Sequence, residues 1–149
     1  MTLAPTWIGI DVSKAWLDIA DPAAGHGERI ANRPDVLAAF AAALTGRDIA
    51  VVFEATGAYD RHLRHALAAA GVGFVRVNPQ RARDFARATG QLAKTDVIDA
   101  AVLARMGRSL QLGADKAPDA DRERLALLGK RRDQLVAMRT QEKARRAGR

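Results

Sequence analysis

The spacing of short apolar segments near the N-terminus constrains the fold more than any other feature of this sequence. Trp7–Val12 and Ala15–Asp21 both have the composition of strands, and only Ser13 and Lys14 separate them. A two-residue connection joins antiparallel strands, whereas parallel strands need a long crossover. A turn containing Pro and Gly then leads to a third strand around Glu28–Ala31. The first part of the chain is therefore predicted to be an antiparallel meander.

The next part of the chain alternates between helix-like and strand-like segments. Helices are predicted at Pro34–Leu44, Tyr59–Gly71, Gln80–Gly90 and Thr95–Leu112, and strands at Ile49–Glu54 and Gly73–Val77. The strand Ile49–Glu54 is apolar up to its last residue, which is typical of a strand covered on both faces. A meander followed by βα units predicts an α/β fold with a mixed five-stranded sheet flanked by helices.

The positive charge is concentrated in the C-terminal part of the chain. The net charge is +7, and residues 121–149 hold 10 Lys and Arg against 4 Asp and Glu. We predict a sheet domain over residues 1–112, a linker over 113–121 and a basic helix over 122–149. Apolar residues on this helix are sparse, so the heptad pattern of a coiled coil is weak. The basic helix suits a polyanion such as nucleic acid, but a solvated surface helix explains the charge equally well.

Composition excludes several classes of protein. Cysteine is absent, which rules out disulfides and thiolate metal sites. No window approaches the ~18 apolar residues of a membrane span. The first residues also lack the layout of a secretory signal. We expect a soluble cytoplasmic protein that does not bind membranes.

Four carboxylates lie at strand or helix ends in apolar surroundings: Asp11, Glu54, Asp96 and Asp99. An acid in such a place is costly unless it is paired, solvated or bound to a cation. Asp96 and Asp99 are three residues apart, so in a helix they share one face. Oxygen ligands suit Mg²⁺ or Mn²⁺ rather than zinc, and two such ions support phosphodiester cleavage.

Each of these acids also has a simpler explanation. Asp96 and Asp99 would gain ~0.3–1 kcal/mol each from the helix dipole. Glu54 would cap the following helix, and Asp11 would pair with Lys14. Taken singly, each simpler explanation is favoured. Together the four acids favour a metal site, because two separate strands direct a carboxylate toward the same end of a sheet.

Other polar residues give weaker signals. A phosphate track and a solvated helix face both remain open for the basic residues Arg81, Arg83, Arg87 and Lys94. His62 and His65 are three apart on a helix without an acidic partner in a recognisable motif, so we expect them to face solvent.

Four segments resemble DEDD-type insertion-sequence transposases, the bridge-RNA-guided recombinases whose relatives include a pilin-gene invertase. They are WIGIDVSKAWLDIA, FEATGAY, VNPQRARDFARATGQLAKTDVIDAAVLA and RRDQLVAMRTQEKAR. They cover nearly the whole chain in the order of the family, and their combination is highly specific.

The resemblance implies a RuvC-like domain of the RNase H fold, with Asp11, Glu54, Asp96 and Asp99 as a catalytic tetrad that binds Mg²⁺, or Mn²⁺ in its place. It implies bacterial, nucleoid-associated DNA transposition, with DNA and a guide RNA as partners. Nucleic-acid contacts are then expected from Lys14, Arg81, Arg83, Arg87, Lys94, Arg131, Arg132 and Arg139. The basic helix would lead into a coiled coil that assembles a dimer or tetramer.

Family members continue into a second domain that carries a serine nucleophile, and this chain stops at Arg149. We therefore expect the chain alone not to complete recombination. Two alternatives from other classes remain: a nucleic-acid-binding scaffold without catalysis, and half of an actin-like sugar kinase or ATPase. The second lacks the glycine-rich loops that bind nucleotide phosphates.

Overall fold

The computed structural model describes residues 5–90, 98–113 and 120–148. Five strands form one sheet: β1 (Thr6–Val12), β2 (Trp16–Ala20), β3 (Gly27–Ala31), β4 (Ile49–Glu54) and β5 (Phe74–Val77). The helices are α1 (Pro34–Leu44), α2 (Arg61–Ala69), α3 (Pro79–Ala88), α4 (Ala100–Leu110) and α5 (Ala120–Ala147). The strand order is β3-β2-β1-β4-β5. Strands β1, β2 and β3 pair antiparallel, and β4 pairs parallel with both β1 and β5. The predicted five-stranded mixed α/β sheet is confirmed.

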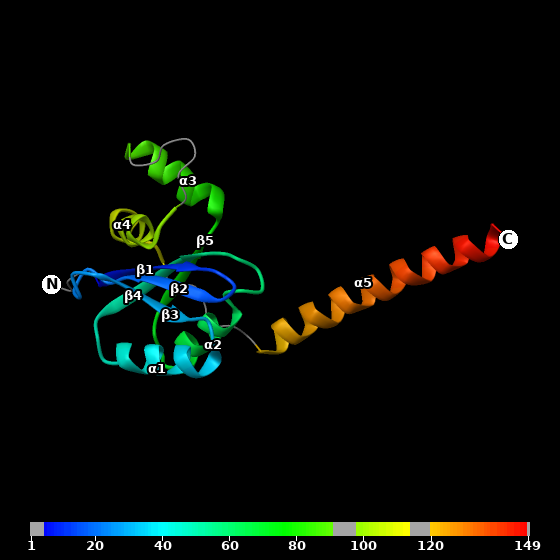
Figure 1. The fold of residues 1–149 in the computed structure, drawn as a ribbon, viewed down its shortest axis with the longest axis horizontal. Coiled ribbons are helices and arrows are strands. Elements are labelled where there is room, and N and C mark those ends of the chain that lie inside the picture. The colour runs from blue at the N-terminus through cyan, green and yellow to red at the C-terminus, as the bar shows by residue number, and fades with distance from the viewer. Residues whose placement is uncertain (1–4, 91–97, 114–119, 149) are drawn as a thin grey trace. The chain divides into compact units, whose positions relative to one another are not determined.

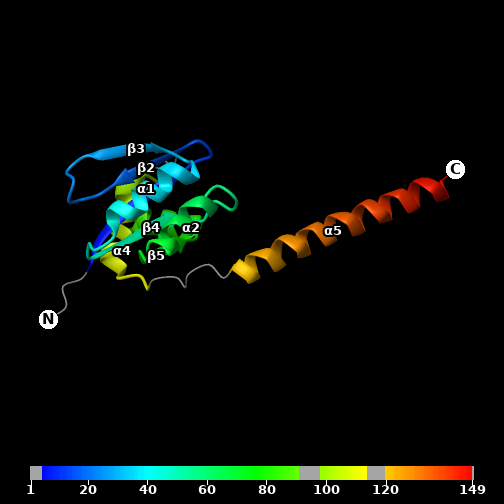
Figure 2. The same ribbon diagram turned by 90° about the horizontal axis from the view of Figure 1, so that it is seen from below.

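Helices cover both faces of the sheet. Figure 1 shows α3 and α4 on one face and α1 and α2 on the other, and Figure 2 views the sheet from the α1 and α2 side. Ile8 and Ile10 of β1 belong to the core under α1 and α2. Because successive residues of a strand point to opposite faces, Trp7, Gly9 and Asp11 face α3 and α4. Trp7 is indeed part of the second core on that side.

Helix α4 packs directly on β1, and two glycines make this possible. A Cβ atom on Gly9 would overlap the backbone of Ala100 and Ala104. One on Gly107 would overlap the indole ring of Trp7. These contacts place the first turn of α4 beside the C-terminal half of β1. Only glycine permits this close approach of helix and strand.

The start of α4 corrects one prediction. The helix was predicted from Thr95, but it begins at Ala100, and Asp99 before it has an extended backbone with φ −98° and ψ 171°. The helix begins after Asp99 because the Asp99 carboxylate caps its N-terminus. Asp is among the residues preferred at this position. The argument that Asp96 and Asp99 share a helix face is therefore wrong. Asp96 and Lys94 lie outside the described residues.

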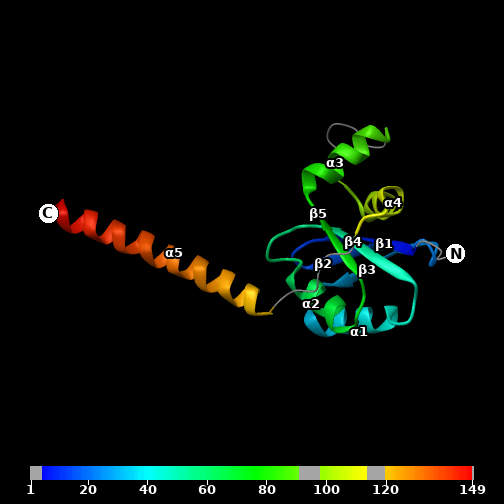
Figure 3. The same cartoon turned by 180° about the vertical axis from the view of Figure 1, so that it is seen from behind.

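Helix α5 is described by itself. It is one continuous helix that begins at Ala120, inside the predicted linker over residues 113–121 (Figure 3). Six large apolar side chains on it are at least half exposed: Leu125, Leu127, Leu128, Leu135, Val136 and Met138. None of the described helices is long and apolar enough to cross a membrane.

Candidate active site

Asp11 and Glu54 lie next to each other at the ends of neighbouring strands. The parallel register of β1 and β4 pairs Ile10 with Phe53, so the following residue on each strand is an acid. Ile10 and Phe53 point into the core under α1 and α2, which turns both carboxylates toward α3 and α4. Both acids are only partly exposed. The prediction that two strands direct acids to one end of the sheet is confirmed for this pair.

Asp99 joins them from the start of α4. One carboxylate oxygen, Oδ1, accepts a hydrogen bond from the amide of Val102 at 2.8 Å, which caps the helix. Its negative charge contributes to raising the pKa of Asp11, so the two acids interact. The structure thus brings together three of the four predicted acids, while the fourth, Asp96, lies outside the described residues.

Burial and neighbouring negative charges raise the pKa of both strand acids. Burial is the main cause that raises the pKa of Asp11 above 3.8, followed by the charges of Asp18 and Asp99, while Arg29 acts in the opposite direction. Burial likewise raises the pKa of Glu54 above 4.5, with a smaller contribution from Asp11 and an opposing one from Arg83. Within the described part of the chain, neither carboxylate has a hydrogen bond or an ion pair.

A fifth acid, Asp18, lies directly opposite Asp11 in the β1–β2 register. The guanidinium of Arg29 on β3 donates two hydrogen bonds to the Asp18 carboxylate, from Nε to Oδ1 at 2.7 Å and from an Nη to Oδ2 at 3.1 Å. This hydrogen bonding is the main cause that lowers the pKa of Asp18. The sequence does not single out Asp18, because the β1–β2 and β2–β3 registers are needed to place it beside Asp11 and Arg29.

The donor set fits a hard divalent cation. The three converging groups are all carboxylates, two of them partly buried without a compensating partner, and Mg²⁺ and Mn²⁺ favour such oxygen ligands. As the side chains stand, no three described His, Cys, Asp or Glu residues form a group that holds a metal ion. The Mg²⁺ tetrad therefore stays a prediction.

The predicted nucleic-acid contacts occupy separate places. Arg83 on α3 is exposed and acts electrostatically on Glu54. Its neighbours Arg81 and Arg87 are exposed on the same helix, with Arg87 3.8 Å from Asp84. Lys14 is exposed in the β1–β2 turn, and the other described candidates, Arg131, Arg132 and Arg139, are exposed on α5. Among the described candidates, Arg83 is thus the one that acts on a predicted acid, and α5 carries basic side chains of its own.

A buried ionic cluster fixes the loop that follows Glu54, and sequence reasoning missed it. Asp60 is fully buried and accepts hydrogen bonds from the amide of Thr56 at 3.1 Å, from Arg64 at 2.9 Å and from Arg76 at 3.1 Å. The carboxylate thereby ties the start of α2 to β5. The sequence pattern places Asp60 in the first turn of the predicted helix Tyr59–Gly71, and nothing in it pairs Asp60 with an arginine sixteen residues away.

Asn32 connects the loops that follow the two acid-bearing strands. Its side-chain amide donates to the carbonyl of Ser13 at 2.8 Å and to the carbonyl of Tyr59 at 2.9 Å. Ser13 follows β1 and Tyr59 lies in the loop after β4. Asn32 therefore links the loops that follow the strands carrying Asp11 and Glu54. His62 and His65 are exposed on α2, as predicted.

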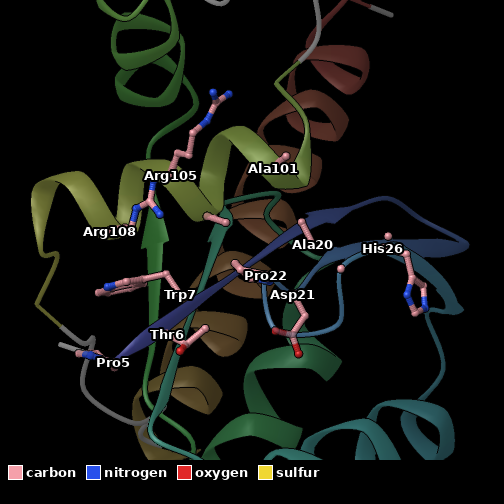
Figure 4. A pocket seen from close by; sticks show the side chains of 13 residues that line it. Pro5, Thr6, Trp7, Ala20, Asp21, Pro22, His26, Ala101, Arg105 and Arg108 are labelled. Carbon is pink, nitrogen blue, oxygen red and sulfur yellow. The ribbon is translucent and has the colours of Figure 1, made fainter. Parts of the chain in front are cut away.

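A cavity of about 820 Å³ lies on the same sheet face, between α4, the start of β1 and the β2–β3 turn. Figure 4 shows Arg105 and Arg108 on α4 above Trp7, with Ala20 and His26 on the hairpin side. None of the three described acids, Asp11, Glu54 and Asp99, lines the cavity.

The comparison with protein families agrees with this arrangement. The family model of DEDD transposases of the IS110 type, described as a transposase, matches residues 8–147. No curated protein matches the chain. The match starts within β1 and ends at the last residue of α5, and it includes all four predicted acids. The five-stranded mixed sheet is the RNase H-like fold expected of this family. The chain therefore belongs to the DEDD transposase family of the IS110 type.

Proposed function

We propose that the sheet domain carries the metal-dependent centre that cleaves and transfers DNA strands in transposition. Asp11, Glu54, Asp96 and Asp99 would hold Mg²⁺, or Mn²⁺ in its place. The observation that carries the proposal is the pair of partly buried acids, Asp11 and Glu54, which has no compensating partner among the described residues. Such a pair is costly to keep ionised, and a bound cation removes that cost.

The residues around the acids have distinct roles in this proposal. A bound divalent cation supplies an activated water and stabilises the leaving oxygen. Asp99 fixes the start of α4 through its cap, and the first turn of α4 offers its partial positive charge to a phosphate. Arg83 attracts the phosphate backbone beside Glu54. Asn32 holds the two strand ends at a constant separation.

We propose further that exposed cations bind the nucleic-acid backbone around this centre. Arg81, Arg83 and Arg87 on α3, with Lys14 and Lys94, would contact DNA phosphates. Arg131, Arg132 and Arg139 on α5 would contact the guide RNA or DNA. Phosphate contacts of this kind weaken steeply with salt. We place this activity in the bacterial cytoplasm, at the nucleoid.

Helix α5 is proposed to assemble two or four copies of the chain. Its half-exposed Leu128, Leu135 and Met138 form an apolar strip at helical spacing. A helix that exposes this much apolar surface gains by packing against a partner helix. Analytical ultracentrifugation of the chain and of Leu128→Ser/Leu135→Ser tests this, because loss of the strip should give monomers.

Metal titration of the purified chain tests the catalytic proposal. Calorimetry with Mn²⁺ should show binding by the native chain and none by Asp11→Asn or Glu54→Gln. Asp18→Asn is the matched control, since Asp18 is already paired with Arg29 and should be dispensable for metal. If Asp11→Asn and Glu54→Gln bind Mn²⁺ with the same heat as the native chain, the proposed metal site is overturned.

A non-catalytic scaffold that binds nucleic acid is the second candidate. It is favoured by one observation: no three described side chains are gathered tightly enough to hold an ion. A scaffold would give no Mn²⁺ heat with the native chain and would bind DNA and RNA equally well with Asp11→Asn.

A further inference from the structure

We propose that one unpaired strand of DNA lies along β2, between α4 and the β2–β3 hairpin. One base would stack on Trp16 beside the acids, and the backbone further along would bind Arg105 and Arg108. The inference rests on the proposed function, because the strand is positioned from a scissile phosphate at Asp11 and Glu54. The family match to a transposase makes DNA the strand expected at these acids.

Trp16 is placed beside the acids by the strand registers. Leu17 and Ile19 of β2 point into the core under α1 and α2, so Trp16, Asp18 and Ala20 face α4. Asp18 is the cross-strand partner of Asp11. Trp16 is then the diagonal neighbour of Asp11, a spacing of about 7–8 Å.

The indole of Trp16 is available for stacking. It is 49% exposed, and no described aromatic ring stacks on it. Asp18, the acid between Trp16 and the cavity, is neutralised by Arg29 and so repels a phosphate less. An exposed aromatic face next to a phosphate-processing site is the type of platform on which unpaired bases stack.

The cavity continues this surface at the other end of β2. Ala20 lines it, on the same face as Trp16 and two residues beyond Asp18. Its apolar floor includes Trp7, and the small side chains of Ala101 and Ala104 on α4 leave the space open. The volume of about 820 Å³ lies within the range of pockets that hold small ligands, so it accommodates parts of one or two nucleotides.

Two arginines at the cavity give it a positive rim. Arg105 and Arg108 are three apart on α4, and Figure 4 shows Arg105 extending away from Trp7 and the sheet. Neither has an ion pair or a hydrogen bond with a described residue. The cavity's acid, Asp21, is bound by Arg47 at 2.9 Å. The net charge that the cavity presents is therefore positive, which suits phosphates.

The spacing matches a strand that passes through the acid site. At 1.5 Å per helical residue, Arg105 and Arg108 lie about 9 and 13 Å along α4 from Asp99. A strand rises about 3.4 Å per nucleotide in duplex DNA, and an unpaired strand is more extended. The two arginines would thus bind phosphates within about four nucleotides of the scissile bond.

Binding of a fluorescently labelled single-stranded oligonucleotide to the 149-residue chain, in EDTA, tests the strand path. Trp16→Ala should weaken binding by about 5- to 150-fold, because stacking on an aromatic is worth ~1–3 kcal/mol per base, and Trp16→Phe should retain most of it. Arg105→Ala/Arg108→Ala should lower the slope of log affinity against log salt by about 1.4, at ~0.7 per phosphate.

Matched control variants test whether the position of Trp16, Arg105 and Arg108 matters, or only the loss of an aromatic ring or of positive charge. Tyr59→Ala removes an aromatic that is 47% exposed but that no strand register places beside Asp11. Arg33→Ala/Arg61→Ala removes two charges from the α1 and α2 side. Both controls should bind DNA like the native chain. Equal weakening by test and control variants would overturn the proposed path.

Photo-crosslinking reads the position directly. An oligonucleotide carrying 5-iododeoxyuridine should crosslink to Trp16, identified by mass spectrometry, and absence of that crosslink would count against stacking. Two competition experiments test which nucleic acid occupies the path. Duplex DNA or RNA of the same sequence, if bound as tightly and with the same loss in Trp16→Ala, would overturn the assignment to unpaired DNA.

Mn²⁺ calorimetry on the same variants separates this inference from the proposed function. Trp16→Ala and Arg105→Ala/Arg108→Ala should bind Mn²⁺ like the native chain. If they also bind DNA like the native chain while Asp11→Asn loses Mn²⁺, the strand path fails and the metal site stands. If the native chain binds no Mn²⁺, the metal site fails, and a strand path without it would be a binding groove only.

Discussion

The two faces of the sheet treat a buried carboxylate in opposite ways. On the α1 and α2 side, Asp60 is fully buried, and two arginines and a backbone amide satisfy it. On the α3 and α4 side, Asp11 and Glu54 are partly buried and lie beside further acids, with no partner among the described residues. One cluster is complete within the chain. The other is left uncompensated by the residues that the structure describes.

This difference is the one expected between a structural charge and the functional one proposed for Asp11 and Glu54. A buried acid with a full set of donors stabilises the loop geometry around it, and removal of either side leaves an uncompensated charge. Acids that repel each other cost free energy in the isolated protein and are retained where they bind a cation or do chemistry. Five substitutions, in four predictions, test or sharpen this contrast, in order of expected effect.

The largest effect is expected from Asp60→Ala. It would leave Arg64 and Arg76 without their buried carboxylate, and breaking a buried ion pair costs about 3–5 kcal/mol. Urea unfolding should show this loss. Asp35→Ala is the control, because its ion pair with Arg33 is exposed and long at 3.4 Å, and stability there should change little. A change as small as that of the control would remove the structural half of the comparison.

Gly9→Ala is expected to have the second-largest effect on stability. Its new Cβ would collide with the backbone of Ala100 and Ala104, and overpacking of this kind costs about 1–3 kcal/mol. It should also push α4 off β1 and weaken Mn²⁺ binding by separating Asp99 from Asp11. Gly27→Ala, where the nearest atom is 3.7 Å away, should change neither property. A native melting temperature for Gly9→Ala would contradict the packing described for α4.

Asp11→Asn and Glu54→Gln are expected to stabilise the metal-free chain. Because the pKa of each acid is raised in the folded state, its contribution to stability is present below its ordinary pKa, near pH 4. That contribution is lost as the pH rises through the raised value. The amide variants should therefore melt at a higher temperature at neutral pH in EDTA, and the gain should vanish in acid. Lower melting temperatures at neutral pH would show that these acids are compensated after all.

The smallest effect is expected from Arg29→Ala. Arg29 lowers the pKa of both Asp18 and Asp11, so its removal should raise both, as followed by NMR titration of the side-chain carboxyl groups. The melting temperature should hardly change, because the pair is exposed. An unchanged titration of Asp11 would mean that Arg29 does not act on the acid site.

Most of the fold could be predicted from the sequence, since each strand and helix has its own periodicity and the connection lengths decide parallel against antiparallel pairing. The pairing of Asp11 with Glu54 was also predictable, because both acids come at strand ends. The start of α4 was not. An Asp at this position is equally typical of the first turn of a helix and of an N-cap. Only the extended backbone of Asp99 in the structure identifies it as the N-cap.

By itself, the sequence determined the order of strands and helices, the basic character of α5 and the family, because these depend on local patterns and short motifs. Only the tertiary structure decided which charges are compensated. Asp18 meets Arg29 and Asp60 meets Arg76 through strand registers and loop geometry, whereas Asp11 and Glu54 form no ion pair with any residue that the structure describes. The physical reason is that the free energy of a charge depends on what lies within a few ångströms of it, and residues far apart in the chain supply those neighbours.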